Sequence, residues 1–207
     1  MGKTGIGHLF VISGPSGVGK DVTVDAMSQL AEYKQCCFSS PKSYTTRNER
    51  TNSKYDANYI FITEEEFETL VEEGEILECT SSHGFMYGTS KKDFEECLQS
   101  GNNILKILDN NGARKIKRLY PVDSTIIYMR PPTMRILEQR LKQRGSEDRE
   151  SFHRRMIDSL SEIDDIAGYD YVITNNDIDN TASLIMSIIT NVLYEKENSI
   201  GIFGECE

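Results

Sequence analysis

Apolar and polar positions alternate along the chain in a way that predicts strands and helices in turn. Short apolar runs predict strands at 8–13, 58–62, 75–80, 103–108, 124–130 and 169–174. Helical spacing and helix-start signals predict helices over about 20–33, from a Thr-x-x-Glu capping box at 63–66 to near 74, from Ser90 to before 101, after Pro132, and over about 178–196. This alternation predicts an α/β fold with a mainly parallel sheet flanked by helices.

Two polar regions interrupt the alternation and are expected to be inserts on a single domain that spans 1–207. Residues 39–89 carry short strands and turns, and residues 142–155 are dense in charge. The expected core then comprises 1–38, 90–141 and 156–197, followed by a loose tail at 198–207.

Composition narrows the class of protein. With 207 residues and 38% hydrophobic residues, the chain is long and apolar enough for one folded core. Its net charge of -10 argues against nucleic acid or an anionic membrane as the main partner. The five cysteines lack the spacing of a zinc site or a disulfide framework, and the start does not resemble a signal peptide. A cytoplasmic protein with reduced thiols is expected.

The strongest motif follows the first predicted strand. The string SGPSGVGKD matches a phosphate-binding loop from Gly14 to Lys20, in which Gly14, Gly17 and Gly19 allow the backbone N–H groups to face an anion. Lys20 would reach the terminal phosphates of a nucleotide. The loop sits between a strand and a helix, as phosphate binding requires.

The residue after the loop lysine departs from that motif. A Ser or Thr hydroxyl is expected there as a Mg²⁺ contact, and this chain has Asp21. Two arrangements are open. Asp21 contacts Mg²⁺ directly or through water, or it turns toward the first turn of its own helix, where negative charge is favourable.

Arginine and tyrosine side chains supply further candidate phosphate ligands. Arg47 and Arg50 have the spacing of a bidentate phosphate clamp, although a solvated surface pair would look the same. Tyr87 beside a glycine either packs or donates to a phosphate. The segment around Gly145 is either an exposed charged helix or an anion-binding segment, and it holds Arg140, Arg144, Arg149, Arg154 and Arg155.

Taken together, these motifs resemble the guanylate kinases, which are P-loop nucleoside monophosphate kinases. The strings SGPSGVGK, SYTTRNER, MYGTS, LDNNGA, QRLKQRG and YDYVITNND occur in that family's order. The resemblance covers about residues 9–196 and implies a P-loop NTPase core with an NMP-binding insert at 39–89 and an Arg-rich lid at 142–155. It implies transfer of the ATP γ-phosphoryl group to GMP or dGMP with Mg²⁺ as cofactor.

The resemblance also implies roles for individual residues. Those implied for GMP binding are Ser43, Arg47, Arg50, Tyr59, Glu78, Tyr87, Thr89 and Asp109. Those implied for ATP binding are Gly14, Pro15, Ser16, Gly17, Val18, Gly19, Lys20, Asp21 and Asn175, with Asp21 as the candidate metal contact. Lys20, Arg140, Arg144 and Arg155 are implied to neutralise the transferring phosphoryl group.

Within this set, Glu78 is the residue whose chemistry separates the purines. Guanine presents N1–H and an exocyclic amine side by side, and one carboxylate accepts from both. Adenine has no such donor pair, so its binding would leave the carboxylate unpaired. Partners of the chain are therefore expected to be ATP and GMP or dGMP, with a monomer and a homodimer both open.

The chain departs from the family pattern at several points besides Asp21. Ile107 replaces the first Asp of a D-x-D string of which Asp109 is the second, and RTNS replaces an R-x-G-E turn. The G-K-D loop also resembles that of the ribose 1,5-bisphosphokinases, which lack a carboxylate at the position of Glu78. A non-catalytic guanylate kinase-like binding module is a further alternative, but such modules usually have an eroded loop and lid.

Overall fold

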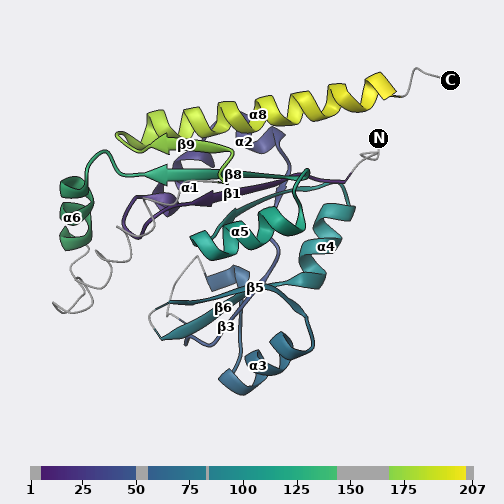
Figure 1. The fold of residues 1–207 in the computed structure, drawn as a ribbon, viewed down its shortest axis with the longest axis vertical. Helices are drawn as coiled ribbons and strands as arrows, with labels where there is room; N and C mark the ends of the chain where they lie inside the picture. Colours follow the sequence, from purple (N-terminus) through teal and green to yellow (C-terminus); the bar gives the residue numbers. More distant parts are fainter. Residues whose placement is uncertain (1–5, 50–55, 83, 144–167, 204–207) are drawn as a thin grey trace. The chain divides into compact units, whose positions relative to one another are not determined.

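The first apolar run forms strand β1 (Leu9–Ser13), whose five residues are all buried. The sheet that contains β1 has five strands in the order β2 (Phe38–Ser39), β7 (Asn103–Ile107), β1, β8 (Ser124–Arg130) and β9 (Tyr171–Thr174). The pairs β2–β7 and β8–β9 are parallel. This computed structural model describes residues 6–49, 56–82, 84–143 and 168–203 (Figure 1). The predicted α/β fold with a parallel sheet is confirmed.

Contacts divide the chain into two units. The first contains residues up to Val11 and Phe38–Ser124, and the second contains Ile12–Cys37 and the chain from Thr125 onward. Strand β1 contributes residues to both units.

The first unit carries a four-stranded sheet in the order β4-β3-β6-β5. Its strands are β3 (Ser43–Thr45), β4 (Tyr59–Phe61), β5 (Ile76–Ser82) and β6 (Phe85–Ser90). Strand β3 pairs in parallel with β4 and antiparallel with β6, and a bulge between Ile76 and Cys79 interrupts the β5–β6 hairpin. The pairing places residues from distant parts of the sequence side by side.

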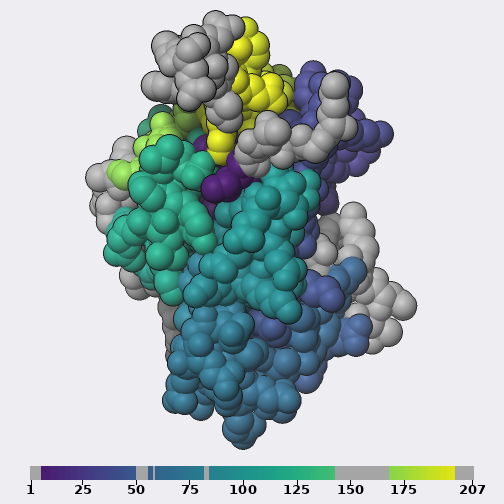
Figure 2. Space-filling model, turned by 90° about the vertical axis from the view of Figure 1, so that its right-hand side faces the viewer, coloured from purple at the N-terminus to yellow at the C-terminus, as the bar shows by residue number. Residues whose placement is uncertain are grey.

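Helix α3 (Glu64–Glu72) covers part of this sheet through Phe67, which is only 1% exposed. The predicted capping box is present, since Thr63 and Glu66 exchange hydrogen bonds between side chain and backbone. Gly88 makes the packing possible, because a Cβ atom there would lie 2.6 Å from Ile76 and 3.1 Å from Phe67. In the space-filling view the blue and teal segments of this unit pack without a visible break (Figure 2).

The remaining elements of the first unit are β2 (Phe38–Ser39), the short helix η1 (Asp56–Asn58), α4 (Lys91–Gln99), β7 (Asn103–Ile107) and α5 (Asn110–Leu119). As predicted, Ser90 caps α4 by accepting from the Asp93 N–H group. Helix α5 is not among the helices that the sequence pattern predicts. It begins at the N-cap Asp109, whose side chain accepts from the Gly112 N–H group.

The second unit contains α1 (Lys20–Met27), α2 (Ala31–Gln35), β8 (Ser124–Arg130), α6 (Met134–Gln143), β9 (Tyr171–Thr174) and α8 (Ile178–Phe203). Helices α1 and α2 contact α8, which is the yellow helix in Figures 1 and 2. Helix α8 buries Ala182, Ile185, Met186 and Ile189, which form one apolar stripe at helical spacing.

Two helix boundaries differ from the prediction. The helix expected over about 20–33 is two helices, because Leu30 is extended (φ -75°, ψ 144°) and the Ser28 hydroxyl donates to the Asp25 carbonyl. Helix α8 passes the expected end at Lys196 and reaches Phe203, so it enters the segment predicted as a tail. No proline interrupts that stretch, and Glu195, Lys196 and Glu197 are all good helix formers.

Among the described residues, no helix combines the length and apolar character needed to cross a membrane.

Candidate active site

The phosphate loop connects β1 to α1 in the second unit. Gly14, Gly17 and Gly19 have φ angles of 138°, 81° and 104°, a region that side-chain-bearing residues rarely adopt. There is also no room for a side chain at Gly14, because a Cβ atom there would lie 2.2 Å from the Met129 carbonyl oxygen. The loop therefore has the left-handed turns that allow successive N–H groups to face an anion.

Lys20 begins α1 and lies back over this loop. Its Nζ donates to the carbonyl oxygens of Gly14 at 2.5 Å and Pro15 at 3.2 Å. These two neutral acceptors help to hold the cation at the loop. A phosphate group is a stronger, charged acceptor for the same donor.

Two side chains from later in the sequence hold the loop at Val18. Arg140 on α6 donates from Nη1 to the Val18 carbonyl at 3.1 Å and from Nη2 to the Asn175 carbonyl at 3.2 Å. The Asn175 side chain donates to the same Val18 oxygen at 2.8 Å. Arg140 and Asn175 therefore meet at the loop carbonyl.

Asn175 is almost fully buried, at 1% exposure. Its Oδ1 accepts from the Thr181 hydroxyl at 3.0 Å, and its Nδ2 donates to the Val18 carbonyl. Both ends of the amide are therefore engaged in holding the loop. Sequence reasoning missed Thr181, because a hydroxyl one turn into a long apolar helix gives no signal of its own.

Asp21 lies in the first turn of α1, and its side chain is exposed. A carboxylate at this position is favourable toward the positive end of the helix. Within the described part of the chain, no group of three or more His, Cys, Asp or Glu side chains forms a metal cluster.

In the first unit, the pairing of β3 with its neighbours brings four predicted GMP ligands together. Ser43 pairs with Tyr59 on β4 and with Thr89 on β6, and Thr45 pairs with Tyr87. Because alternate residues of a strand share a face, Ser43, Tyr59, Tyr87 and Thr89 lie on one face of the sheet. The rings of Tyr59 and Tyr87 meet edge to face at 6.0 Å between centroids.

Glu78 on β5 lies beside this face and is 4% exposed. Its Oε1 accepts from the Thr89 hydroxyl at 2.5 Å. Burial raises the pKa of Glu78, and the Thr89 hydrogen bond and the nearby Lys106 charge oppose that shift. The site therefore holds a desolvated carboxyl group, which needs strong donors to be stable in its charged form.

Asp109 has a structural role at the start of α5. Its Oδ1 caps the helix through Gly112, and its Oδ2 accepts from the Thr80 hydroxyl. Gly112 lies close to both carboxylates, since a Cβ atom there would be 3.2 Å from Asp109 Oδ1 and 3.4 Å from Glu78 Oε2. A hollow of about 370 Å³, lined in part by Glu78, Arg114 and Lys115, opens on this side of α5.

Lys106 on β7 is a site residue that sequence reasoning missed. Its Nζ donates to the Ser43 hydroxyl at 2.7 Å and to the Pro41 carbonyl at 3.2 Å. Burial lowers the pKa of Lys106 to about 8, and the charge of Glu78 opposes this shift. A lysine inside the apolar run NILKIL was the available signal, because lysines are rarely buried without a partner.

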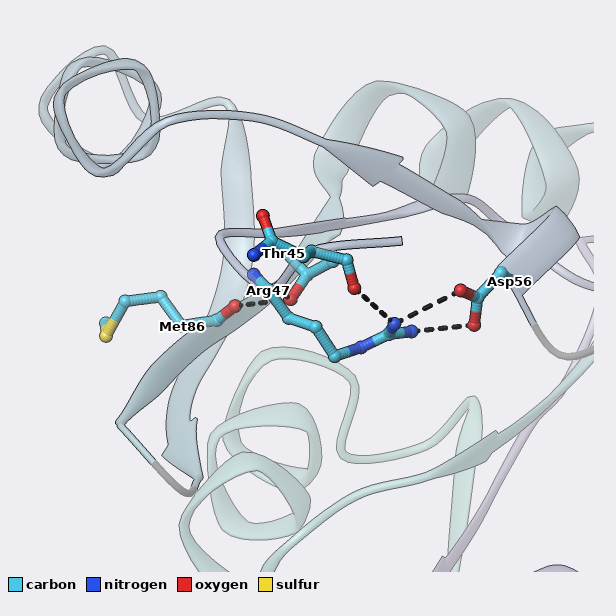
Figure 3. A network of polar contacts seen from close by, with 5 residues as sticks. Thr45, Arg47, Asp56 and Met86 are labelled. Atoms are coloured by element: carbon cyan, nitrogen blue, oxygen red, sulfur yellow. Dashed lines mark hydrogen bonds and ion pairs between the residues drawn. The ribbon is translucent and has the colours of Figure 1, made fainter. Parts of the chain in front are cut away.

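Arg47 is held by a second residue that sequence reasoning missed. Its guanidinium group forms a bidentate ion pair with Asp56, at 2.8 Å to Oδ1 and 3.1 Å to Oδ2, and donates to the Asn48 carbonyl (Figure 3). It also lies 5.4 Å from the centre of the Tyr59 ring, within cation–π range. The Asp56 hydrogen bond is the main cause of the raised pKa of Arg47.

The structure thus describes most of the predicted site residues. Lys20, Arg140, Asn175 and the loop belong to the second unit, and Ser43, Arg47, Tyr59, Glu78, Tyr87, Thr89 and Asp109 belong to the first. Arg50, Arg144 and Arg155 lie outside the described residues, as does most of the predicted lid.

Comparison with known proteins decides the family. A family profile described as guanylate kinase matches residues 7–192. The chain belongs to the guanylate kinase family. The guanylate kinase of Mycoplasma genitalium is 36% identical over 183 residues, which cover 88% of this chain and 75% of that protein. The guanylate kinase of Vibrio parahaemolyticus is 38% identical over 179 residues, covering 86% of this chain and 84% of that protein.

A solved guanylate kinase has the same fold. The crystal structure of guanylate kinase from Anaplasma phagocytophilum aligns with a TM-score of 0.68 and 29% sequence identity, covering 91% of this chain and 87% of that chain. The P-loop NTPase core that the sequence predicts is consistent with this match.

Within this guanylate kinase framework, the ion pair of Arg47 leads to a first prediction. Asp56→Asn should raise the KM for GMP by about tenfold with little change in kcat, because the buried guanidinium loses the charged partner that orients it. Steady-state kinetics over a GMP series measures this. Asp170→Asn, which alters a carboxylate bonded to the Ile126 N–H group in the other unit, is the control and should leave the KM unchanged. A lower KM for Asp56→Asn would mean that Asp56 competes with the phosphate.

Proposed function

We propose that the chain transfers the γ-phosphoryl group of ATP to GMP or dGMP, giving ADP and GDP or dGDP. The observation that carries this proposal is the buried Glu78 beside the sheet face of Ser43, Tyr59, Tyr87 and Thr89. A desolvated carboxyl group bonded to one hydroxyl suits the paired N–H donors of guanine. Family membership supports the same reaction.

On the acceptor side, the residues bind and orient the nucleotide. Glu78 would accept from the guanine N1–H and exocyclic amine, with Ser43 and Thr89 supplying hydroxyl groups beside it. Arg47, with Arg50, Tyr59 and Tyr87, would hold the GMP phosphate by charge and hydrogen bonding. Asp109 would act from the start of α5, where it already accepts from Thr80 and Gly112.

On the donor side, the loop from Gly14 to Gly19 would enclose the ATP phosphates with its N–H groups. Lys20 would move from the Gly14 and Pro15 carbonyls to the phosphates and stabilise the charge that develops during transfer. Arg140, with Arg144 and Arg155, is proposed to add positive charge. Asn175 is proposed to support the adenine side by holding the loop at Val18.

Mg²⁺ is the proposed cofactor, and the residues fit it. Mg²⁺ keeps several waters and needs only one or two protein carboxylates beside the phosphates of its nucleotide. The exposed Asp21 carboxylate in the first turn of α1 offers such an oxygen ligand. When bound, Mg²⁺ neutralises phosphate charge.

Asp21 supplies a second prediction. Asp21→Ala should raise the Mg²⁺ concentration for half-maximal activity by about tenfold, because a carboxylate ligand is lost, and Asp21→Ser should restore part of the difference. A Mg²⁺ titration at fixed ATP and GMP measures this. Asp25→Ala, further along the same helix, is the control. If Asp21→Ala and the parent have the same Mg²⁺ dependence, Asp21 is only a helix-start residue.

The activity itself is tested by ADP release in a coupled assay. The parent protein with ATP and Mg²⁺ should turn over GMP or dGMP, with AMP, UMP and ribose 1,5-bisphosphate at least about a hundredfold poorer in kcat/KM. Turnover of ribose 1,5-bisphosphate alone would favour the sugar-phosphate kinase. No turnover with any acceptor would favour the binding module.

We also propose a cytoplasmic location and no nucleic-acid or membrane partner. The net charge of -10 disfavours anionic partners. Among the described residues, Cys36, Cys37, Cys79 and Cys97 form no disulfide, which suits a reducing compartment.

A further inference from the structure

Lys106 joins two segments of the first unit that are far apart in the sequence. It lies on β7, and its Nζ bonds to Ser43 Oγ at the start of β3 and to the Pro41 carbonyl just before it. The hydrogen bond to Ser43 spans 63 residues of sequence. These two hydrogen bonds give this charged side chain of β7 its partners.

The bond from Lys106 determines how the Ser43 hydroxyl can bond. A serine hydroxyl has one O–H donor and two lone pairs, and an ammonium group can only donate. Because Lys106 uses a lone pair of Ser43 Oγ, the Ser43 proton cannot point at Lys106 and is directed to another acceptor. Ser43 is thereby biased to act as a donor at the face it shares with Tyr59 and Thr89.

Lys106 also lies within the field of Glu78. The charge of Glu78 acts to raise the pKa of Lys106, and the charge of Lys106 acts to lower the pKa of Glu78. Lys106 thus offsets part of the cost of keeping a buried carboxylate charged. One ammonium group thus orients the Ser43 hydroxyl as a donor and also stabilises the Glu78 carboxylate as an acceptor.

The edge of the guanine ring needs one hydrogen-bond donor and one acceptor from the protein. Guanine has a carbonyl oxygen at C6, which accepts, next to the N1–H and amine donors. Adenine has an amine at C6, which offers no acceptor for the Ser43 proton. A Ser43 donor next to an acceptor at Glu78 therefore matches guanine, whereas adenine has neither the C6 acceptor nor the N1–H donor.

We propose that Lys106 is a positioning and specificity residue of the acceptor site, which orients the Ser43 hydroxyl as a donor toward a purine carbonyl at C6. The inference rests on the proposed function, since it takes GMP as the ligand. Lys106 acts through Ser43, and it is not placed in contact with the nucleotide.

The test is a double-mutant cycle read out by binding. Lys106→Met keeps the length and removes the charge, and Ser43→Ala removes the hydroxyl. The dissociation constant for GMP is measured calorimetrically without ATP for the parent, both single variants and the double variant. We expect each single variant to weaken GMP binding about tenfold and the double variant to fall well short of the roughly hundredfold loss of two independent effects, with any loss beyond Ser43→Ala measuring the support of Glu78.

A nucleotide without the carbonyl separates orientation from general damage. The 5′-monophosphate of 2-aminopurine riboside lacks the C6 oxygen and with it the N1–H, but it keeps the exocyclic amine and the phosphate, so Lys106→Met should bind it within about twofold of the parent. Lys117→Met is the matched control, because Lys117 is another partly buried lysine of this unit, which donates to the Ser124 carbonyl at 2.9 Å. It should leave GMP binding unchanged.

Several results would overturn the inference. These are an unchanged GMP dissociation constant in Lys106→Met, losses that multiply fully in the double variant, or equal losses for GMP and the 2-aminopurine nucleotide. If Lys106→Met does not fold, Lys106→Gln, which keeps a shorter donor, takes its place with the same expectations at about threefold. Parent turnover of GMP, measured in parallel, tests the proposed function separately, because the binding cycle does not depend on turnover.

Discussion

Glu78→Gln should weaken GMP binding by about 30- to 1,000-fold, equivalent to a loss on the order of 2–4 kcal/mol. The substitution keeps the shape of the side chain and replaces one acceptor oxygen by an N–H₂ donor. That donor would face the N–H groups of guanine in a site where Glu78 is 4% exposed, so the clash cannot be relieved by water. Calorimetric titration with GMP measures the loss directly.

The same variant should fold at least as well as the parent. The glutamine amide oxygen would still accept from the Thr89 hydroxyl, and the amide has no charge to desolvate. Burial raises the pKa of Glu78 in the folded state, so the folded protein binds the proton more tightly than the unfolded chain does. The contribution of Glu78 therefore favours folding at low pH and is lost as pH rises through the raised pKa.

Thermal unfolding across pH separates recognition from stability. At neutral pH, Glu78→Gln should have an unfolding temperature equal to that of the parent or up to a few degrees higher, about 2–4 °C for each kcal/mol gained. Glu68→Gln, an exposed glutamate of α3, is the control for both measurements. Unchanged GMP affinity in Glu78→Gln would remove Glu78 as the guanine reader, and weaker affinity together with a much lower unfolding temperature would mean that it mainly supports the fold.

Local patterns were sufficient to predict most of the elements around these residues. The capping box at Thr63, the cap at Ser90 and the glycine-rich loop each depend on residues within one turn of helix, so the sequence states them directly. Helix α5 was missed because Asn110, Asn111 and Gly112 are poor helix formers. The N-cap Asp109 is the start signal of this helix, but the family resemblance implies a role for it in GMP binding.

Such local patterns do not predict the residues that hold the site residues in place. Lys106 reaches Ser43, and Arg140 reaches Val18 over 122 residues, and no spacing rule covers contacts between such distant segments. Asp56 lies nine residues from Arg47, a separation at which no spacing rule predicts a side-chain pair. The family resemblance names residues proposed to touch the nucleotides, whereas these partners hold such residues in place.

The loop provides the sharpest case of this difference. Asn175 was predicted to bind ATP, and its amide is engaged with Val18 and Thr181. Gly19 is tied to the same contact, since a Cβ atom there would lie 2.8 Å from Asn175 Nδ2. The shape of the phosphate loop thus depends on β9 and α8 as well as on its own glycines.

Lys20→Met should lower kcat by about 10²–10³-fold, the loss typical of removing one donor that stabilises transition-state charge. Methionine fills much of the same space and has no charge, so the loop keeps its packing and loses its cation. In the parent, Nζ donates to the Gly14 and Pro15 carbonyls, which places it at the loop where the ATP phosphates are proposed to bind. Single-turnover kinetics at saturating ATP and GMP measures the chemical step.

A purely structural role for Lys20 predicts a different set of results. If Lys20 only tethers the Gly14 and Pro15 carbonyls, Lys20→Met would lower the unfolding temperature and leave kcat within about threefold of the parent, because the net value of such bonds is about 1 kcal/mol each. GMP affinity without ATP should be unchanged under either role, since the proposed GMP ligands belong to the other unit. Lys34→Met, an exposed lysine of α2, controls for loss of charge. A large loss of kcat at unchanged GMP affinity and stability is thus the result that only a cation acting on the transferred phosphoryl group explains.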